Sequence, residues 1–546
     1  MFMVGTEKTV IYTNLVRDRS IFLESFKLWT KRLIVIAAII QFFCFPTSEN
    51  VLAVLLVIVG WMCTDFFVLN KYTISKYLFS TFIIIGYSIT QFFIPIVFTL
   101  FEGKPLVYNL KYPSSVFAHS LLALFVLVAA HYVYISLYKS EFFIYLSNRI
   151  RLGLAKLSLY KPINDTQGWI IGCVGLMAML YTFVESNHYD EMLEHKGAWG
   201  KFIEGLMIYA YAPYFLLLRP IFDPVIRITK KYNYTPIVLY TVIMIVVGLA
   251  GNSRSIFMKG ITAVAITYFL GLLINVFSYR IFTPKKILLA VFFILFMSGP
   301  LADLGISMVI VRGQRYDTSP VELISRTFDI YSSKDEINLF KKIATKDFHD
   351  WDETYFENIF LARFSNLKFN DLSLEQYYKL NNVDVTLQNY SYERTMALFP
   401  QPVLNFLGVE IDKSHALQGS YGDLLYYRTK GNGSDFGGFR VGHFAGVGMA
   451  SFGWWYLLIL FILLVPCYFL NDLLFYKIKN SSQLICTLPA LISIGSIFLF
   501  LGLLSNNIEN PIALITYIVR GWPQLIILYI LLYHVSRKIS NIFTTK

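Results

Sequence analysis

The sequence predicts an all-α polytopic membrane protein with about twelve transmembrane helices and one large, mainly helical domain outside the cytoplasm. Two observations carry this prediction. Of the 546 residues, 56% are hydrophobic and 15% are charged, whereas soluble domains carry about 25% charged residues. The apolar residues also gather in runs of a length that can cross a bilayer, about 20 residues. So much apolar surface needs lipid as part of its solvent, which excludes a water-soluble fold.

The predicted spans are apolar runs separated by short polar segments. They cover residues 33–46, 51–69, 77–100, 115–138, 169–184, 203–218, 236–251, 256–278, 287–311, 443–470, 484–504 and 511–533. The first, fifth, sixth and seventh runs are the shortest. Polar residues precede the first run, so we expect that run to act as an uncleaved signal anchor.

The positive residues between the runs predict the orientation. With a cytoplasmic N-terminus, the inner segments carry 25 Lys and Arg residues and the short outer loops carry 5. Because Lys and Arg collect on the cytoplasmic side, both termini are predicted to be cytoplasmic. Three parts follow: helices one to nine in 1–311, an extracytoplasmic domain in 312–442, and helices ten to twelve in 443–546.

The long outer segment has a different composition from the rest of the chain. From Leu301 to Gly442 it holds 15 Lys or Arg residues and 19 Asp or Glu residues. Amphipathic patterns predict helices that begin at Pro320 and Ser373, and the Gly-rich residues 419–448 predict a loop that returns to the membrane. A connection of this length is usually functional.

Composition also limits the kinds of ligand that the chain is expected to bind. The formal charge is +12, but the basic residues flank apolar runs, so they indicate topology and not a nucleic-acid surface. The five cysteines lie in or beside apolar runs, and no His or Cys cluster has metal-ligand spacing. The first outer loop, TSEN, carries Glu49 alone as an acidic residue. We therefore expect no metal, no cofactor and no nucleic acid.

Arg520 is the cation with the most informative position. It follows Pro511 by nine residues, so a helix carries it roughly 14 Å into the membrane. A charge at this depth must face protein or water. We predict that it lines a polar cavity open to the outside; the alternative is an arginine that pairs with a buried carbonyl and fixes helix packing. Gly521, Trp522 and Pro523 should kink the helix just after it.

Other cations lie near the predicted outer boundary. Arg254 and Lys259 lie in GNSRSIFMKG at a helix start, where backbone N–H groups favour an anion. Arg312 and Arg315 are three residues apart where the chain leaves the membrane, so a helix would place them on one face. For Arg254 and Lys259, the alternative is that they reach the membrane interface as snorkelling side chains. For Arg312 and Arg315, the alternative is a solvated helix face.

Arg440 and His443 lie three residues apart at the Gly-rich return. The glycines there either admit a ligand close to the backbone or let helices pack. Arginines gathered at one membrane boundary suit a lipid diphosphate, which takes bidentate donors. The candidate general bases are His443 and the carboxylates Glu393, Asp423 and Asp435, which lie in or near this return. A surface carboxylate without a catalytic role is the alternative for each of the three.

With these features the chain resembles the Wzy-type polymerases, which join O-antigen or oligosaccharide repeat units. The resemblance covers the number of spans, both termini inside, one dominant outer loop late in the chain, the arginine of GNSRS and the Gly-rich HFAGVG before the next span. Family members often have a glycine eleven residues after an arginine in two outer loops. Here neither Arg254 nor Arg440 has a glycine at that spacing, so this chain departs from the strict pattern.

The resemblance implies a metal-independent glycosyltransferase of GT-C type. Its donor would be a growing glycan on undecaprenyl diphosphate, and its acceptor one repeat unit on the same carrier, giving O-antigen, capsule or exopolysaccharide. The arginines would stabilise the leaving diphosphate, and a carboxylate or His443 would take the proton of the acceptor hydroxyl. The lipid bilayer and a chain-length regulator protein are the other implied partners.

Three other classes of protein stay open. An O-antigen ligase has nearly the same plan and differs in its acceptor. A lipid-linked glycan transporter or flippase predicts charges on several helices near the bilayer centre, whereas deep charges here are few and Arg520 is the clearest. A receptor or structural protein would not need converging arginines.

Overall fold

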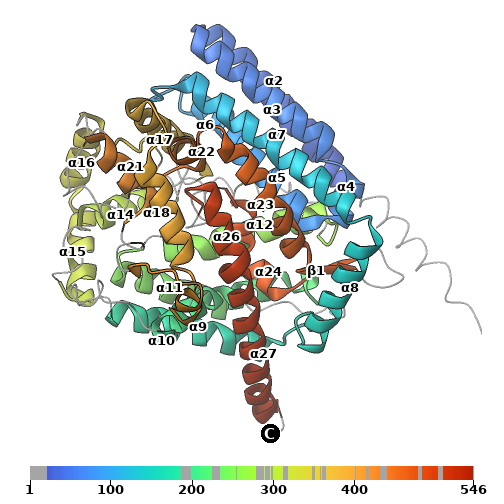
Figure 1. Ribbon diagram of the computed structural model, residues 1–546. Helices are drawn as coiled ribbons and strands as arrows, with labels where there is room; N and C mark the ends of the chain where they lie inside the picture. The colour runs from blue at the N-terminus through green and yellow to red at the C-terminus, as the bar shows by residue number, and fades with distance from the viewer. Residues whose placement is uncertain are drawn as a thin grey trace, which may run out of the picture.

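The computed structural model describes residues 21–185, 198–223, 234–253, 255–277, 288, 296, 299–311, 318–346, 351–356, 358, 364–399, 401–413, 416, 419–430, 440–477, 483–501 and 508–544. Over these residues the chain is mainly helical, with one pair of short strands (Figure 1). The predicted all-α class is confirmed.

Within the described residues, eight helical segments are long and apolar enough to cross a membrane. They are Ser48–Phe67, Leu78–Phe101, Pro113–Leu137, Asp165–Phe183, Trp199–Ile221, Ser255–Leu273, Trp455–Asp472 and Pro511–Ile542. Two shorter apolar helices are α11 (Thr235–Ala250) and α14 (Pro300–Ile310). The chain is therefore a multi-pass membrane protein, and the predicted total of about twelve spans stays a prediction.

The N-terminal helices are α2 (Ile21–Cys44), α3 (Ser48–Phe67), α4 (Lys71–Lys76), α5 (Leu78–Ser88), η1 (Ile89–Phe93), α6 (Ile94–Phe101), α7 (Pro113–Leu137) and α8 (Glu141–Lys156). Of these helices, α2, α3 and α7 lie along one side of the molecule, and α5 lies in the interior (Figure 1). In Figure 1, α2, α3 and α7 run side by side, and α3 packs against both neighbours. The hydroxyl of Thr47 accepts the backbone N–H of Asn50 and so caps α3.

The next helices pack closely because glycines face the contact. They are α9 (Asp165–Glu185), α10 (Ala198–Leu206), η2 (Met207–Ile221), α11 and α12 (Ser255–Leu273). A Cβ atom on Gly175 of α9 would lie 2.1 Å from the backbone nitrogen of Ala210 in η2. Pro213 and Pro220 lie inside η2 and cannot donate a backbone hydrogen bond, which disfavours a regular α-helix there.

The long polar segment contains six described helices. They are α15 (Pro320–Ser332), α16 (Lys334–Lys346), α17 (Leu367–Leu380), α18 (Val385–Met396), α19 (Gln401–Phe406) and α21 (Tyr421–Lys430). The predicted start at Pro320 is confirmed, with Ser319 as its cap. The predicted start at Ser373 is wrong, because α17 begins six residues earlier. The Gly-rich return is also not all loop, since it includes α21.

Helix α17 lies in the interior although its sequence is polar. Every residue from Leu367 to Gln376 is buried, and the helix packs against α7 and α22 (Phe444–Phe452). The Asn370 amide donates to the Val116 carbonyl, 3.3 Å away. Such partners satisfy polar groups that would otherwise be costly to bury. The long segment is therefore integrated with the spanning helices.

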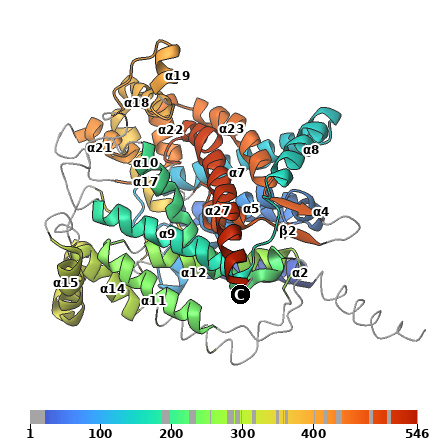
Figure 2. The ribbon, with the colours of Figure 1, turned by 90° about the horizontal axis from the view of Figure 1, so that it is seen from below.

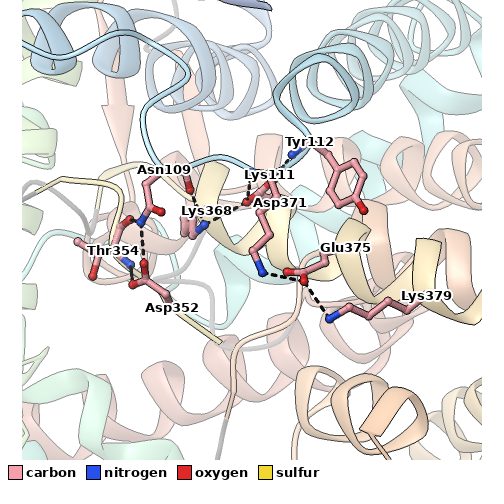
Figure 3. A network of polar contacts seen from close by, with 9 residues as sticks. All are labelled: Asn109, Lys111, Tyr112, Asp352, Thr354, Lys368, Asp371, Glu375 and Lys379. Atoms are coloured by element: carbon pink, nitrogen blue, oxygen red, sulfur yellow. Dashed lines mark hydrogen bonds and ion pairs between the residues drawn. The ribbon is translucent and has the colours of Figure 1, made fainter. Parts of the chain in front are cut away.

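A polar network attaches α17 to the segment between α6 and α7 (Figure 3). The carboxylate of Asp371 accepts the backbone N–H groups of Lys111 (2.9 Å) and Tyr112 (2.8 Å). The Lys368 ammonium lies 3.1 Å from the same carboxylate, and side-chain exposure is 2% for Lys368 and 0% for Asp371. One turn later, Glu375 pairs with Lys111 at 2.8 Å. The network fixes the position of α17 at this end of the bundle.

The C-terminal part consists of α22, α23 (Trp455–Asp472), β1 (Phe475–Lys477), β2 (Leu484–Cys486), α24 (Leu488–Ile492), α25 (Ile494–Phe498), η6 (Pro511–Ala513), α26 (Leu514–Thr516), η7 (Tyr517–Gly521) and α27 (Trp522–Thr544). In Figure 2 the C-terminal end of α27 faces the viewer near the middle of the molecule.

Two predicted spans differ from this structure. The run 443–470 is broken at Gly453 (φ +57°, ψ −148°), a backbone conformation that is nearly restricted to glycine. The run 484–504 is not one helix: it begins with β2, which pairs antiparallel with β1, and continues as the short helices α24 and α25. All five residues of α24 are buried, so protein and not lipid surrounds this apolar segment.

The predicted orientation can be tested with impermeant thiol labelling of intact cells. In a cysteine-free background, Phe406→Cys at the exposed end of α19 is expected to react from outside. Lys538→Cys, at an exposed position of α27, is expected to react only after lysis, because Lys and Arg mark the inner side. Labelling with the reverse pattern would overturn the orientation.

Candidate functional site

Arg520 lies in a π-helical turn of the last span. The turn η7 covers Tyr517–Gly521 and α27 follows directly. Pro523 has no N–H to donate to the carbonyl four residues earlier, and a wide turn accommodates this loss; π turns are frequent at functional sites. Thr516, Arg520 and Gln524 recur at four-residue spacing, so they share one face of the helix.

That face lines a cavity of ≈ 360 Å³. The cavity is also lined by Glu204 of α10, by Arg394, Thr395 and Leu398 in or just after α18, by Tyr421 of α21, and by Glu509, Ala513 and Gly521. Among the described residues, Arg520 has no hydrogen bond or ion pair. Its guanidinium donors are therefore not satisfied by any other described residue, and the side chain lines the cavity.

Arg394 is the second cation of this cavity. Its Nη1 donates to the Tyr390 hydroxyl (2.6 Å) and to the Gly419 carbonyl (3.0 Å). Its Cζ lies 5.6 Å from the ring centre of Tyr390 and 5.2 Å from that of Tyr421, within the range of cation–π attraction. These contacts fix the arginine at the wall of the cavity. Sequence reasoning missed Arg394 because its helix resembles a solvated amphipathic helix.

Asn510 joins the elements that carry the two arginines. Its side-chain oxygen accepts the Ile512 N–H at 3.2 Å and caps η6. Its amide donates to Ser391 of α18 at 2.9 Å and lies 3.4 Å from the hydroxyl of Ser451 in α22. Because Asn510 is fully buried, these bonds set the position of α18 against the start of the last span.

Glu509 supplies a carboxylate to the same cavity. Its Oε2 accepts the backbone N–H groups of Tyr421 (3.0 Å) and Gly422 (3.3 Å) at the start of α21. Burial raises the pKa of Glu509 to about 7, although the nearby Arg394 charge and the backbone N–H groups of Gly442, Gly422 and Tyr421 lower it. Sequence reasoning missed Glu509. The feature that could have identified it is its position: it is the only carboxylate of a predicted outer loop without Lys or Arg, directly before a predicted helix start.

Lys259 lines a second cavity of ≈ 340 Å³. Ser253 and Ser255 also line it, with their hydroxyls 3.0 Å apart. Glu204 lines both cavities, so the two lie next to each other. Two predicted cations, Lys259 and Arg520, are thus brought to neighbouring spaces from α12 and η7.

Arg440 lies against other side chains. Its Nη1 is 3.6 Å from Asp423, and its Cζ lies 4.2 Å from the ring centre of Tyr426. The same carboxylate accepts the Arg440 backbone N–H at 2.9 Å. Arg440 and Asp423 are not among the described residues that line either cavity. These contacts hold the return segment against α21.

His443 is 3% exposed and caps α22. Its Nδ1 accepts the Ala445 N–H at 3.3 Å, and its own backbone N–H donates to Ser373 at 2.9 Å. Burial, with a smaller effect of His119, lowers the pKa of His443 to about 3. Glu393 precedes Arg394 on α18 and does not line the described cavities. The roles proposed for both stay predictions.

Four predicted site residues, Arg254, Arg312, Arg315 and Asp435, lie outside the described residues. Within the described part of the chain, no group of three or more His, Cys, Asp and Glu side chains is placed to hold a metal ion.

The cavity around Arg520 therefore combines two guanidinium groups, two carboxylates, hydroxyls and an amide. Guanidinium groups bind phosphate oxygens in bidentate fashion, and the remaining groups can hydrogen-bond sugar hydroxyls. Comparison of the chain with models of known families, with curated proteins and with solved structures found no match.

Proposed function

We propose that this chain is a glycosyltransferase that joins undecaprenyl-diphosphate-linked oligosaccharide repeat units into O-antigen, capsule or exopolysaccharide chains on the outer face of the bacterial inner membrane. One observation carries the proposal: an arginine of the last span and an arginine of the polar segment line one cavity beside a carboxylate. An arginine within a spanning helix is costly unless it meets an anion or water.

In the proposed reaction, a hydroxyl oxygen of the acceptor sugar attacks the anomeric carbon of the donor. The bond from that carbon to the diphosphate breaks, and its electron pair leaves on undecaprenyl diphosphate. Arg520 and Arg394 bind the diphosphate oxygens where negative charge develops. Fixed donors in a site with little water stabilise such charge strongly.

The test is polymerisation by the purified protein in liposomes that contain lipid-linked repeat units. A ladder of products that differ by one repeat unit, all still on the lipid carrier, supports the polymerase. If glycan moves only to an added lipid A core acceptor, the chain is a ligase. If the lipid-linked unit crosses the bilayer unchanged, it is a flippase.

Polymerisation is also expected to continue in EDTA, because the guanidinium groups supply the positive charge that a divalent cation would otherwise supply. The measurement is the rate of ladder formation with and without the chelator. Loss of activity in EDTA, with recovery on adding Mg²⁺ or Mn²⁺, would contradict the proposed role of the arginines.

A further inference from the structure

Two carboxylates line the cavity of Arg394 and Arg520, and they are held differently. Glu204 lies on α10 at the boundary with the second cavity. Glu509 lies in the short segment before η6, and its Oε2 is fixed by the N–H groups of Tyr421 and Gly422. Both of these hydrogen bonds end on Oε2, the backbone N–H of Gly442 also hydrogen-bonds the carboxylate, and Glu509 lines the cavity.

The surroundings of Glu509 favour a group that exchanges a proton near neutral pH. Burial raises its pKa to about 7, against the opposing effects of Arg394 and of the backbone N–H groups. Arg394 and Tyr390 of α18 and Tyr421 of α21 interact with it electrostatically, and Arg520 of η7 and Glu204 of α10 line the same cavity. A general base works best when its pKa lies near the working pH.

We propose that Glu509 is the general base of the glycosyl transfer, which takes the proton of the acceptor hydroxyl while Arg394 and Arg520 hold the leaving diphosphate. This inference rests on the proposed function and assigns one of its steps. It also locates the acceptor: the attacking hydroxyl lies between the Glu509 carboxylate and the diphosphate, within hydrogen-bond reach of the carboxylate.

The step balances without a further reactant. The acceptor O–H bond breaks as its oxygen forms the bond to the anomeric carbon, and the proton goes to the Glu509 carboxylate. The electron pair of the broken glycosyl bond goes to the diphosphate oxygen. Glu509 then releases its proton to water before the next cycle.

A purely structural role for Glu509 is the competing explanation, because its Oε2 accepts the first N–H groups of α21, where a carboxylate is favoured. Glu509→Gln separates the two roles. Glutamine has the same shape and keeps an oxygen that accepts these N–H groups, but its amide cannot act as a base.

The experiment measures kcat/KM for polymerisation against pH, together with the binding of farnesyl diphosphate. For the wild-type protein, kcat/KM is expected to rise as the pH increases through about 7, since the base must be ionised. Glu509→Gln is expected to lose 10²- to 10⁴-fold in rate, on the order expected for a general base, to lose that rise with pH, and to bind farnesyl diphosphate as the wild type does. Glu410→Gln, an exposed carboxylate of the polar segment, is the matched control and should behave as wild type.

Each outcome decides between the hypotheses. A slow Glu509→Gln protein without the pH-dependent rise, and with normal binding, supports the base. A Glu509→Gln protein that keeps both its rate and its pH profile overturns the inference and leaves the polymerase intact. Loss of both activity and farnesyl diphosphate binding also overturns it, in favour of a structural role. If the wild-type protein makes no polymer, the proposed function fails, and the assignment of Glu509 fails with it.

Discussion

Arg520→Ala is expected to reduce polymerisation at least about 100-fold, because lost contact with a developing charge typically costs about 3 kcal/mol. Arg520 lines the cavity from within the last span. Arg520→Lys should fail almost as badly, since an ammonium cannot reproduce the bidentate geometry of a guanidinium. The measurements are activity normalised to folded protein, and binding of farnesyl diphosphate, which both variants should weaken.

The control for this prediction lies on the same helix. Arg537 is an exposed cation of α27 outside the cavity, and Arg537→Ala should leave the rate and the binding unchanged. If Arg520 only fixes helix packing, Arg520→Ala should instead lower the melting temperature while each folded molecule keeps its activity. A stable, fully active Arg520→Ala protein would remove this residue from the site.

Asp371→Ala is expected to destabilise the protein by about 3–5 kcal/mol, as is usual when one partner of a buried ion pair is removed. The change leaves the Lys368 ammonium buried, with side-chain exposure of 2%, and takes away the acceptor of the Lys111 and Tyr112 N–H groups. The measurement is the apparent melting temperature in detergent or nanodiscs, which should fall by several degrees.

The matched control is a solvent-exposed ion pair of the same protein. Glu322 and Arg326 are 2.7 Å apart, with side-chain exposures of 49% and 41%, and exposed pairs contribute about 0–1 kcal/mol. Glu322→Ala should therefore leave the melting temperature nearly unchanged. Equal melting temperatures for Asp371→Ala and Glu322→Ala would show that the network of Figure 3 does not hold α17 in place.

Local patterns account for the predictions that the structure confirms. An apolar run of about 20 residues crosses a bilayer as a helix whatever its neighbours are, and the spans at Ser48–Phe67 and Pro113–Leu137 follow from this alone. The start of α15 at Pro320 likewise depends on its own residues and the Ser319 cap. The prediction of a single span at 484–504 was wrong because α24 is surrounded by protein. Hydropathy does not distinguish a protein interior from lipid.

The sequence by itself determined the all-α membrane class and selected Arg520, because composition, run length and the cost of a charge within a span are properties of short segments. Only the tertiary structure placed Arg394 and Glu509 with Arg520 around one cavity. Glu509 is eleven residues from Arg520, but Arg394 is more than a hundred residues away. Their meeting depends on long-range contacts such as those of Asn510 with Ser391 and Ser451. No periodicity within a segment encodes such contacts, because they arise only when the helices pack.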